Sequence, residues 1–125
     1  MRILLVDDEE ELVSALAERL QLRGITADWA TSGRQALELA HRQTYDVAVI
    51  DLKMPGISGV ELKKQLVAGF PGLRFIFMSG HGSLSTFESG IGEAGHADYF
   101  LLKPVDINQL LGRISELLAT SHQGH

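Results

Sequence analysis

The stretch that decides the fold is Val47-Ala48-Val49-Ile50-Asp51, an unbroken apolar run that ends in a carboxylate. Residues 3–6 and 75–78 form two more runs of the same character. Short runs rich in β-branched or aromatic residues are typical of strands buried on both faces of a parallel sheet. Shorter strand candidates lie at residues 25–29 and 99–102. We therefore predict five strands.

Helical patterns separate these runs. Leu12, Leu16 and Leu20 recur at intervals of four and so form one apolar face. Gly24 is the expected cap at the end of that helix, and Asp106 is the expected cap before the last one. Further helices are predicted over residues 32–43, 59–68 and 107–118. Strand and helix in alternation predict an α/β domain, a doubly wound five-stranded parallel sheet with right-handed crossovers.

Composition narrows the range of functions. The chain has 125 residues, which is the size of one domain, and we place that domain at residues 1–120 with a frayed tail or the start of a linker at 121–125. There are no cysteines, so disulfides and thiolate metal sites are excluded. The formal net charge is −5 and the basic residues are scattered, which argues against direct nucleic-acid binding. Without a signal peptide or an apolar run of about 20 residues, a cytoplasmic location away from membranes is expected.

Polar residues follow four of the predicted strands. Asp7 and Asp8 follow the first, Asp51 the third, Ser79 the fourth and Lys103 the fifth. Ligands of open parallel sheets bind beyond the carboxyl ends of the strands, so we expect these side chains to converge there.

These residue types, placed close together, indicate a particular chemistry. Carboxylates that lie close together repel one another unless a cation neutralises them. Mg²⁺ suits such a site, because it takes one or two carboxylates, waters and a phosphate oxygen. Lys103 then supplies a positive charge for a phosphoryl oxygen, and Ser79 supplies a hydroxyl. A carboxylate nucleophile, a metal and an ammonium are the parts needed to move a phosphoryl group onto an aspartate.

Four segments carry a family resemblance. They are Val-Asp-Asp-Glu at 6–9, Asp-Leu-Lys-Met-Pro-Gly-Ile-Ser-Gly at 51–59, Met-Ser-Gly-His-Gly at 78–82 and Leu-Lys-Pro at 102–104. In order and spacing the chain resembles the receiver domains of two-component response regulators, most of all those of nitrogen-regulation-type regulators and hybrid kinases. The resemblance implies a flavodoxin-like (βα)5 fold with strand order 2-1-3-4-5. It also implies a phosphoacceptor switch that is no enzyme beyond its own phosphorylation and dephosphorylation.

The resemblance also implies roles for single residues. Asp51 would accept the phosphoryl group from a histidine kinase or phosphotransfer protein, and an effector domain or downstream protein would read the result. Mg²⁺ would be held by Asp8, Asp51 and the backbone carbonyl of Lys53, with Asp7 acting largely through water. Ser79 would close onto the phosphoryl group, Phe100 would report that closure, and the bond from Lys103 to Pro104 would be cis. A homodimer is a further expectation left open.

Other interpretations stay open from the residues themselves. Asp7 and Asp8 could favour a helix start, Asp51 could open a turn, and Ser79 could be a cap. Tyr99 competes with Phe100 for the role of switch. A Mg²⁺-dependent phosphatase with an aspartyl nucleophile would want a second acid at the position of Lys53. A receiver fold that only docks partners is the remaining alternative.

The segment from residue 83 to 95 departs from the family pattern. It should supply the fourth helix, yet it holds Gly90, Gly92 and Gly95, and each interior glycine costs a helix about 1 kcal/mol relative to alanine. We predict that this helix is short or displaced and frays before Gly92.

Overall fold

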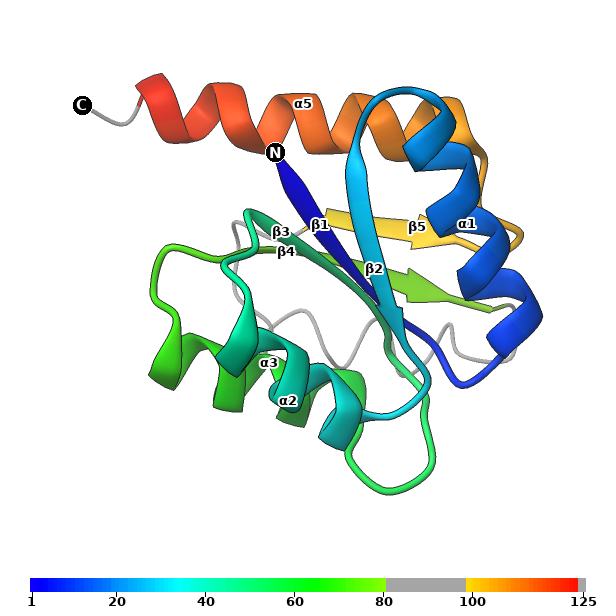
Figure 1. Ribbon diagram of the computed structural model, residues 1–125, viewed down its shortest axis with the longest axis vertical. Coiled ribbons are helices and arrows are strands. Elements are labelled where there is room, and N and C mark those ends of the chain that lie inside the picture. Colours follow the sequence, from blue (N-terminus) through cyan, green and yellow to red (C-terminus); the bar gives the residue numbers. More distant parts are fainter. Residues whose placement is uncertain (81–98, 124–125) are drawn as a thin grey trace.

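The computed structural model describes residues 1–80 and 99–123 (Figure 1). The helix expected over residues 83–95 lies outside the described residues. All strand pairs are parallel, and the order in the sheet is β2-β1-β3-β4-β5, which confirms the predicted fold class. In chain order the elements are β1 (Arg2–Val6), α1 (Glu10–Leu22), β2 (Thr26–Ala30), α2 (Gly33–Arg42), β3 (Val47–Asp51), α3 (Gly59–Gly69), β4 (Arg74–Ser79), β5 (Tyr99–Leu102) and α5 (Ile107–Gln123).

The sheet has a separate apolar core on each face. Figure 1 shows α1 and α5 over one face and α2 and α3 over the other. Because side chains alternate along a strand, Leu4 and Val6 join the core under α2 and α3, while Ile3 and Leu5 join the core under α1 and α5. Every residue of β3, the central strand, is buried, as its unbroken apolar run predicted.

Both predicted helix caps are present. The N–H of Gly24 donates to the carbonyl of Gln21 and the N–H of Ile25 to that of Leu20, each at 3.0 Å. This is a Schellman ending, with Gly24 at φ +79° where a side chain would be strained. At the start of α5 the Asp106 carboxylate accepts hydrogen bonds from the N–H groups of the second and third helical residues, at 2.7 and 3.4 Å.

Most elements lie within one residue of their predicted bounds, and two of the differences are informative. Strand β2 begins at Thr26 rather than at residue 25, because the N–H of Ile25 is used by the end of α1. Helix α5 continues beyond its apolar stripe to Gln123, so residues 121–123 are helical, although the division into a domain and a tail stays a prediction. Within the described parts of the chain, no helix has both the length and the apolar character needed to cross a membrane.

Candidate functional site

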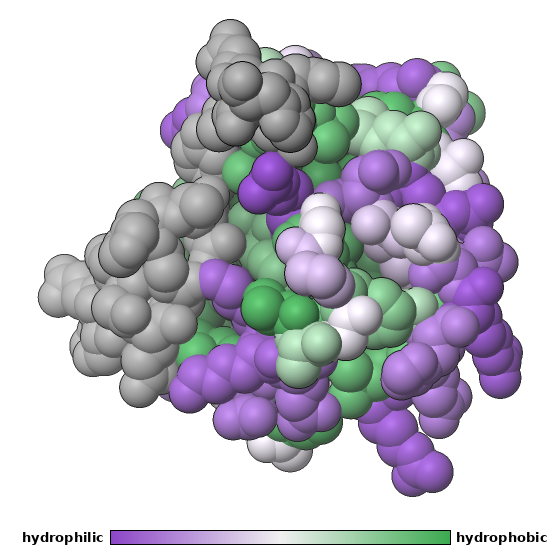
Figure 2. All heavy atoms as spheres, turned by 90° about the vertical axis from the view of Figure 1, so that its left-hand side faces the viewer, coloured by the Kyte–Doolittle hydropathy of each residue, from purple (hydrophilic) through white to green (hydrophobic). Residues whose placement is uncertain are grey.

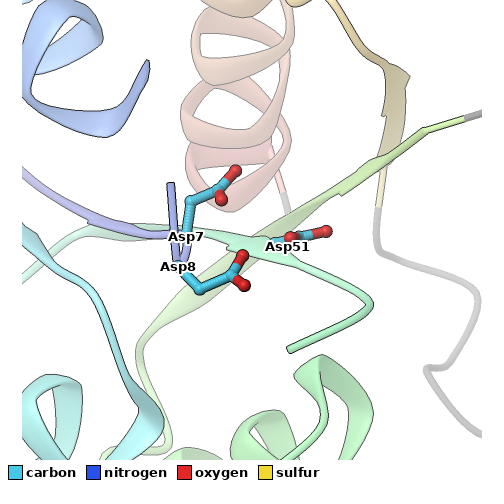
Figure 3. Close-up of side chains that lie close together, drawn as sticks. All are labelled: Asp7, Asp8 and Asp51. Atoms are coloured by element: carbon cyan, nitrogen blue, oxygen red, sulfur yellow. The ribbon is translucent and has the colours of Figure 1, made fainter. Parts of the chain in front are cut away.

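Three carboxylates meet at the carboxyl edge of the sheet. Asp7 and Asp8 follow β1 and Asp51 ends β3, and these strands are neighbours in parallel register, with Val6 opposite Ile50. Figure 3 shows the three side chains reaching into the same space beyond the strand ends. One oxygen from each of the three lies within 4.8 Å of the others. The convergence predicted from the strand order is therefore present.

The two inner carboxylates are shielded from water. Asp7 has no exposed surface and Asp51 is 4% exposed, whereas Asp8 is exposed. Burial raises the pKa of Asp7 above its ordinary value. Burial also raises the pKa of Asp51, and the neighbouring charge of Asp7 raises it further. An ionised site of this kind is electrostatically strained and favours a cation.

Lys103 supplies one such cation. Its Nζ lies 2.7 Å from Asp7 Oδ2, 3.2 Å from Asp51 Oδ2 and 3.3 Å from Glu9 Oε1. Burial alone would lower the pKa of Lys103, but the hydrogen bond to Asp7 and the charges of Asp51 and Asp7 outweigh it and raise that pKa. The lysine stays charged, and its position is fixed by its own backbone N–H, which donates to the carbonyl of Ser79 at 2.8 Å.

The acid cluster fits a divalent cation with oxygen ligands. Asp7, Asp8 and Asp51 carry three negative charges when ionised, and Lys103 balances one of them. Asp7 Oδ2 is fully buried and has the ammonium of Lys103 at 2.7 Å as its partner. The two carboxylates whose charge Lys103 leaves unbalanced match the preference of Mg²⁺ for hard oxygen ligands. Lys53 is exposed and its N–H donates to Asp51 Oδ1 at 3.3 Å, while the role of its carbonyl stays a prediction.

A glycine brings α3 against the end of β3. A Cβ placed on Gly59 would collide with the carbonyl oxygen of Asp51 and would lie 2.8 Å from the Cα of Leu52. The N–H of Gly59 donates to the carbonyl of Leu52 at 3.0 Å and so closes the loop between them. A second glycine, Gly56, has φ +79° and supplies the turn within this loop. The family-like segment after Asp51 thus encodes a tight loop beside the carboxylates.

The remaining predicted site residues lie around this edge. Ser79 is fully buried at the end of β4, and its hydroxyl donates to the carbonyl of Gly80 at 3.3 Å. Phe100 is half-buried and stacks on Phe77, with ring centroids 5.5 Å apart and planes at 25°. The peptide bond between Lys103 and Pro104 is cis, as predicted.

Two contributions to the site were not predicted from the sequence. Glu9 contacts Lys103, and the acidic run Asp7-Asp8-Glu9 was the signal that could have indicated it. The close approach of Gly59 to the backbone of Asp51 had a weaker signal, a glycine at the start of a predicted helix.

A hollow of about 370 Å³ lies at the opposite edge of the sheet from the acid cluster. It is formed by the ends of α2 and α3 and the loops that lead into β3 and β4. On the face of the molecule shown in Figure 2, hydrophobic residues lie among hydrophilic ones. Since the hollow is lined by residues that precede β3 and β4, it does not contribute to the acid cluster. Its lining is Ala40, Gln43, Thr44, Tyr45, Asp46, Gly69, Phe70, Pro71, Gly72 and Leu73.

Comparison with known proteins agrees with this geometry. Residues 3–115 match the family described as the response regulator receiver domain. The response regulator MprA of Mycobacterium leprae (strain TN) is 36% identical over 118 residues, which cover 94% of this chain and 51% of MprA. This chain thus spans about half the length of that relative.

Solved structures of receiver domains are also similar to this chain. A response regulator receiver domain protein from Clostridium thermocellum has a TM-score of 0.86 and 25% identity, over 99% of this chain and 98% of that one. The receiver domain of the hybrid histidine kinase CckA has a TM-score of 0.76 and 32% identity, over 94% of this chain and 99% of that one. With the acid cluster at the edge of a 2-1-3-4-5 sheet, these matches show that the chain belongs to the response regulator receiver domain family of two-component signal transduction.

Proposed function

We propose that this domain is a phosphorylation-controlled switch in which Asp51 accepts a phosphoryl group in a Mg²⁺-dependent reaction. The observation that carries the proposal is the environment of Asp51. Its carboxylate ends the central strand, lies 3.2 Å from the ammonium of Lys103, and has oxygens of Asp7 and Asp8 within 4.8 Å. A buried carboxylate with a cation on one side and further acids on the other is arranged to act as a nucleophile toward a phosphoryl group.

In the transfer itself the protein mainly positions the reacting groups and stabilises charge. An oxygen of Asp51 attacks phosphorus, the bond from phosphorus to the donor nitrogen breaks, and the leaving imidazole of the donor keeps that electron pair and takes a proton. Mg²⁺ held by the acid cluster would supply positive charge to the phosphoryl oxygens. Lys103 adds a second charge and also favours the ionised, nucleophilic form of Asp51 against the effect of burial.

The metal would be held by Asp8, Asp51 and the carbonyl of Lys53, with Asp7 contributing largely through water. The donor set supports this assignment, because Asp8 is the exposed member of the cluster, whereas the fully buried Asp7 is already paired with Lys103 at 2.7 Å. The N–H of Lys53 already binds the Asp51 side chain, which keeps this backbone segment close to the reacting group.

Switching would follow from the groups beside the site. In this proposal the Ser79 hydroxyl turns from the Gly80 carbonyl to the phosphoryl group, and Phe100 changes its packing in response. Phe100 lies on β5 and stacks on Phe77 of β4. The next residue of β4, Met78, lies opposite Asp51 in the sheet. A change at Asp51 would thus reach the surface around β5, α5 and the fourth helix that the sequence predicts over residues 83–95.

The partners follow from membership of the family. A histidine kinase or a phosphotransfer protein would load Asp51, and an effector domain or a downstream protein would read the altered surface. Direct nucleic-acid contact and membrane contact are not part of the proposal, a homodimer is compatible with it, and the cytoplasmic location stays a prediction.

Intact mass measurement tests the proposal. The chain is incubated with Mg²⁺ and acetyl phosphate, and we expect the mass of one phosphoryl group to be gained, then lost slowly. Sustained release of phosphate far beyond one equivalent would instead favour a phosphatase, an interpretation that Lys53 opposes because it occupies the place of the second acid. An unchanged mass would favour a module that only docks partners.

A further inference from the structure

The loop that follows Asp51 carries part of the proposed metal site. It spans residues 52–58 between β3 and α3 and includes Lys53, whose carbonyl is a ligand in the proposed function. Its two ends are tied together where the N–H of Gly59 donates to the carbonyl of Leu52 at 3.0 Å. This hydrogen bond joins only the ends of the loop, so other contacts hold the residues between them.

The body of the loop rests on the first turn of α2. Ile57 is half-buried and packs against the core under α2 and α3. Gly33, the first residue of α2, is buried beside it. A Cβ on Gly33 would lie 3.0 Å from Cβ of Ile57, 3.2 Å from its Cδ1 and 3.5 Å from its Cγ2. The helix and the loop are thus in contact, and one further carbon atom between them would fit only if a neighbour moved by a few tenths of an ångström.

This contact is stiff for a simple geometric reason. The Cβ of Ile57 is bonded directly to the backbone, so no change of rotamer moves it away from Gly33. Gly33 does not have a positive φ, unlike Gly24 and Gly56, so the space and not the backbone conformation requires glycine here. Helix α2 is anchored by the buried residues Ala36 and Ala40, and a clash would therefore displace the loop.

We propose that Gly33 and Ile57 are positioning residues, through whose contact the amino-terminal end of α2 sets the place of the β3–α3 loop and of the Lys53 carbonyl. The inference rests on the proposed function, since it concerns the metal ligand of the same site. Neither residue touches the metal or the phosphoryl group. A displacement of α2 would be passed to the loop backbone and would change the affinity of the site for Mg²⁺.

The substitution Gly33→Ala tests the contact. Mg²⁺ is titrated into the whole chain and binding is followed by amide chemical shifts. We expect Gly33→Ala to weaken Mg²⁺ binding about tenfold, which is the usual effect of disturbing a group that orients a metal ligand.

Gly69→Ala is the matched control, because nothing lies within 4 Å of its added carbon. Glu38→Gly is a second control, which weakens α2 on its exposed side without adding an atom near Ile57. Both controls should bind Mg²⁺ as the parent does.

A double-mutant cycle separates this contact from a general loss of stability. Ile57→Gly removes the Cβ that the added methyl group of Gly33→Ala would meet, so in that background Gly33→Ala should leave Mg²⁺ affinity unchanged. Parent-like affinity of Gly33→Ala, or an equal loss with and without the Ile57 side chain, would overturn the inference. If the parent chain itself shows no Mg²⁺ binding, the proposed function fails first and this role of the contact fails with it.

Discussion

The ammonium of Lys103 lies 2.7 Å from Oδ2 of Asp7, a carboxylate without exposed surface. The two residues come from opposite ends of the domain sequence and meet because β5 and β1 end at the same edge of the sheet. The pair explains how buried carboxylates coexist in the metal-free protein: part of their charge is compensated from within the chain. It also makes Lys103 a structural residue as well as a candidate for phosphoryl binding.

Removal of this lysine should destabilise the metal-free protein. In Lys103→Met the charge of Asp7 loses its partner in a buried place, which typically costs about 3 kcal/mol of unfolding free energy. Glu9→Gln removes an exposed partner of the same lysine and should cost at most about 0.5 kcal/mol. Urea unfolding in the presence of a chelator measures both. Equal effects of the two substitutions would show that the ion pair of Lys103 with Asp7 contributes no more to stability than the exposed pair with Glu9.

Mg²⁺ should stabilise the folded domain through the acid cluster. For a dissociation constant on the order of 1 mM and about 10 mM metal, the gain in unfolding free energy is roughly 1.4 kcal/mol. Asp8→Ala removes the exposed carboxylate of the cluster and should abolish this gain. The substitution also relieves repulsion in the metal-free protein. Thermal unfolding with and without Mg²⁺ tests this, and a parent melting temperature that ignores the metal would contradict the assignment of a metal site.

Tyr45, at the other edge of the sheet, makes the free energy of unfolding depend on pH in the alkaline range. Burial raises the pKa of this phenol above its ordinary value of 10.0, and the hydrogen bond that its hydroxyl donates to Asp28 at 2.7 Å raises it further. The unfolded chain therefore loses this proton first. Stability is fully present below about pH 10 and falls as the pH rises further, by up to about 1.4 kcal/mol per pH unit.

The Tyr45→Phe variant isolates that effect. At about pH 8 it should be less stable than the parent by about 1 kcal/mol, since one hydrogen bond is lost. Towards about pH 11 the difference should shrink or reverse, because the variant has no phenol to ionise. Urea unfolding of both proteins across this range is the measurement. A constant difference would show that Tyr45 does not account for the alkaline loss of stability.

Local chemistry made much of this fold predictable from the sequence. The run from Val47 to Ile50 is typical of a strand covered on both faces, and Gly24 and Asp106 mark helix ends by properties of their own. The site residues were predictable for a related reason. Most of them lie at the end of a strand or directly after it, and parallel strands bring such residues to one edge of the sheet.

What the sequence could not indicate depends on distances between elements. The clash that a side chain on Gly59 would make with the Asp51 carbonyl, and the contact of Gly33 with Ile57, exist only once helices are packed on the sheet. The same holds for the buried pair of Lys103 and Asp7. Periodicity reports which face of a helix is apolar, but it does not report how closely two backbones approach.

The central claim, that Asp51 is the phosphoacceptor, is tested most directly by locating the modification. The chain is treated with Mg²⁺ and acetyl phosphate, the acyl phosphate is reduced with borohydride, and the peptides are mapped by mass spectrometry. We expect homoserine at position 51 in the parent and no modified peptide in Asp51→Asn, with the variant still folded. Homoserine at position 7 or 8 in the parent, or undiminished phosphorylation of Asp51→Asn, would contradict the account.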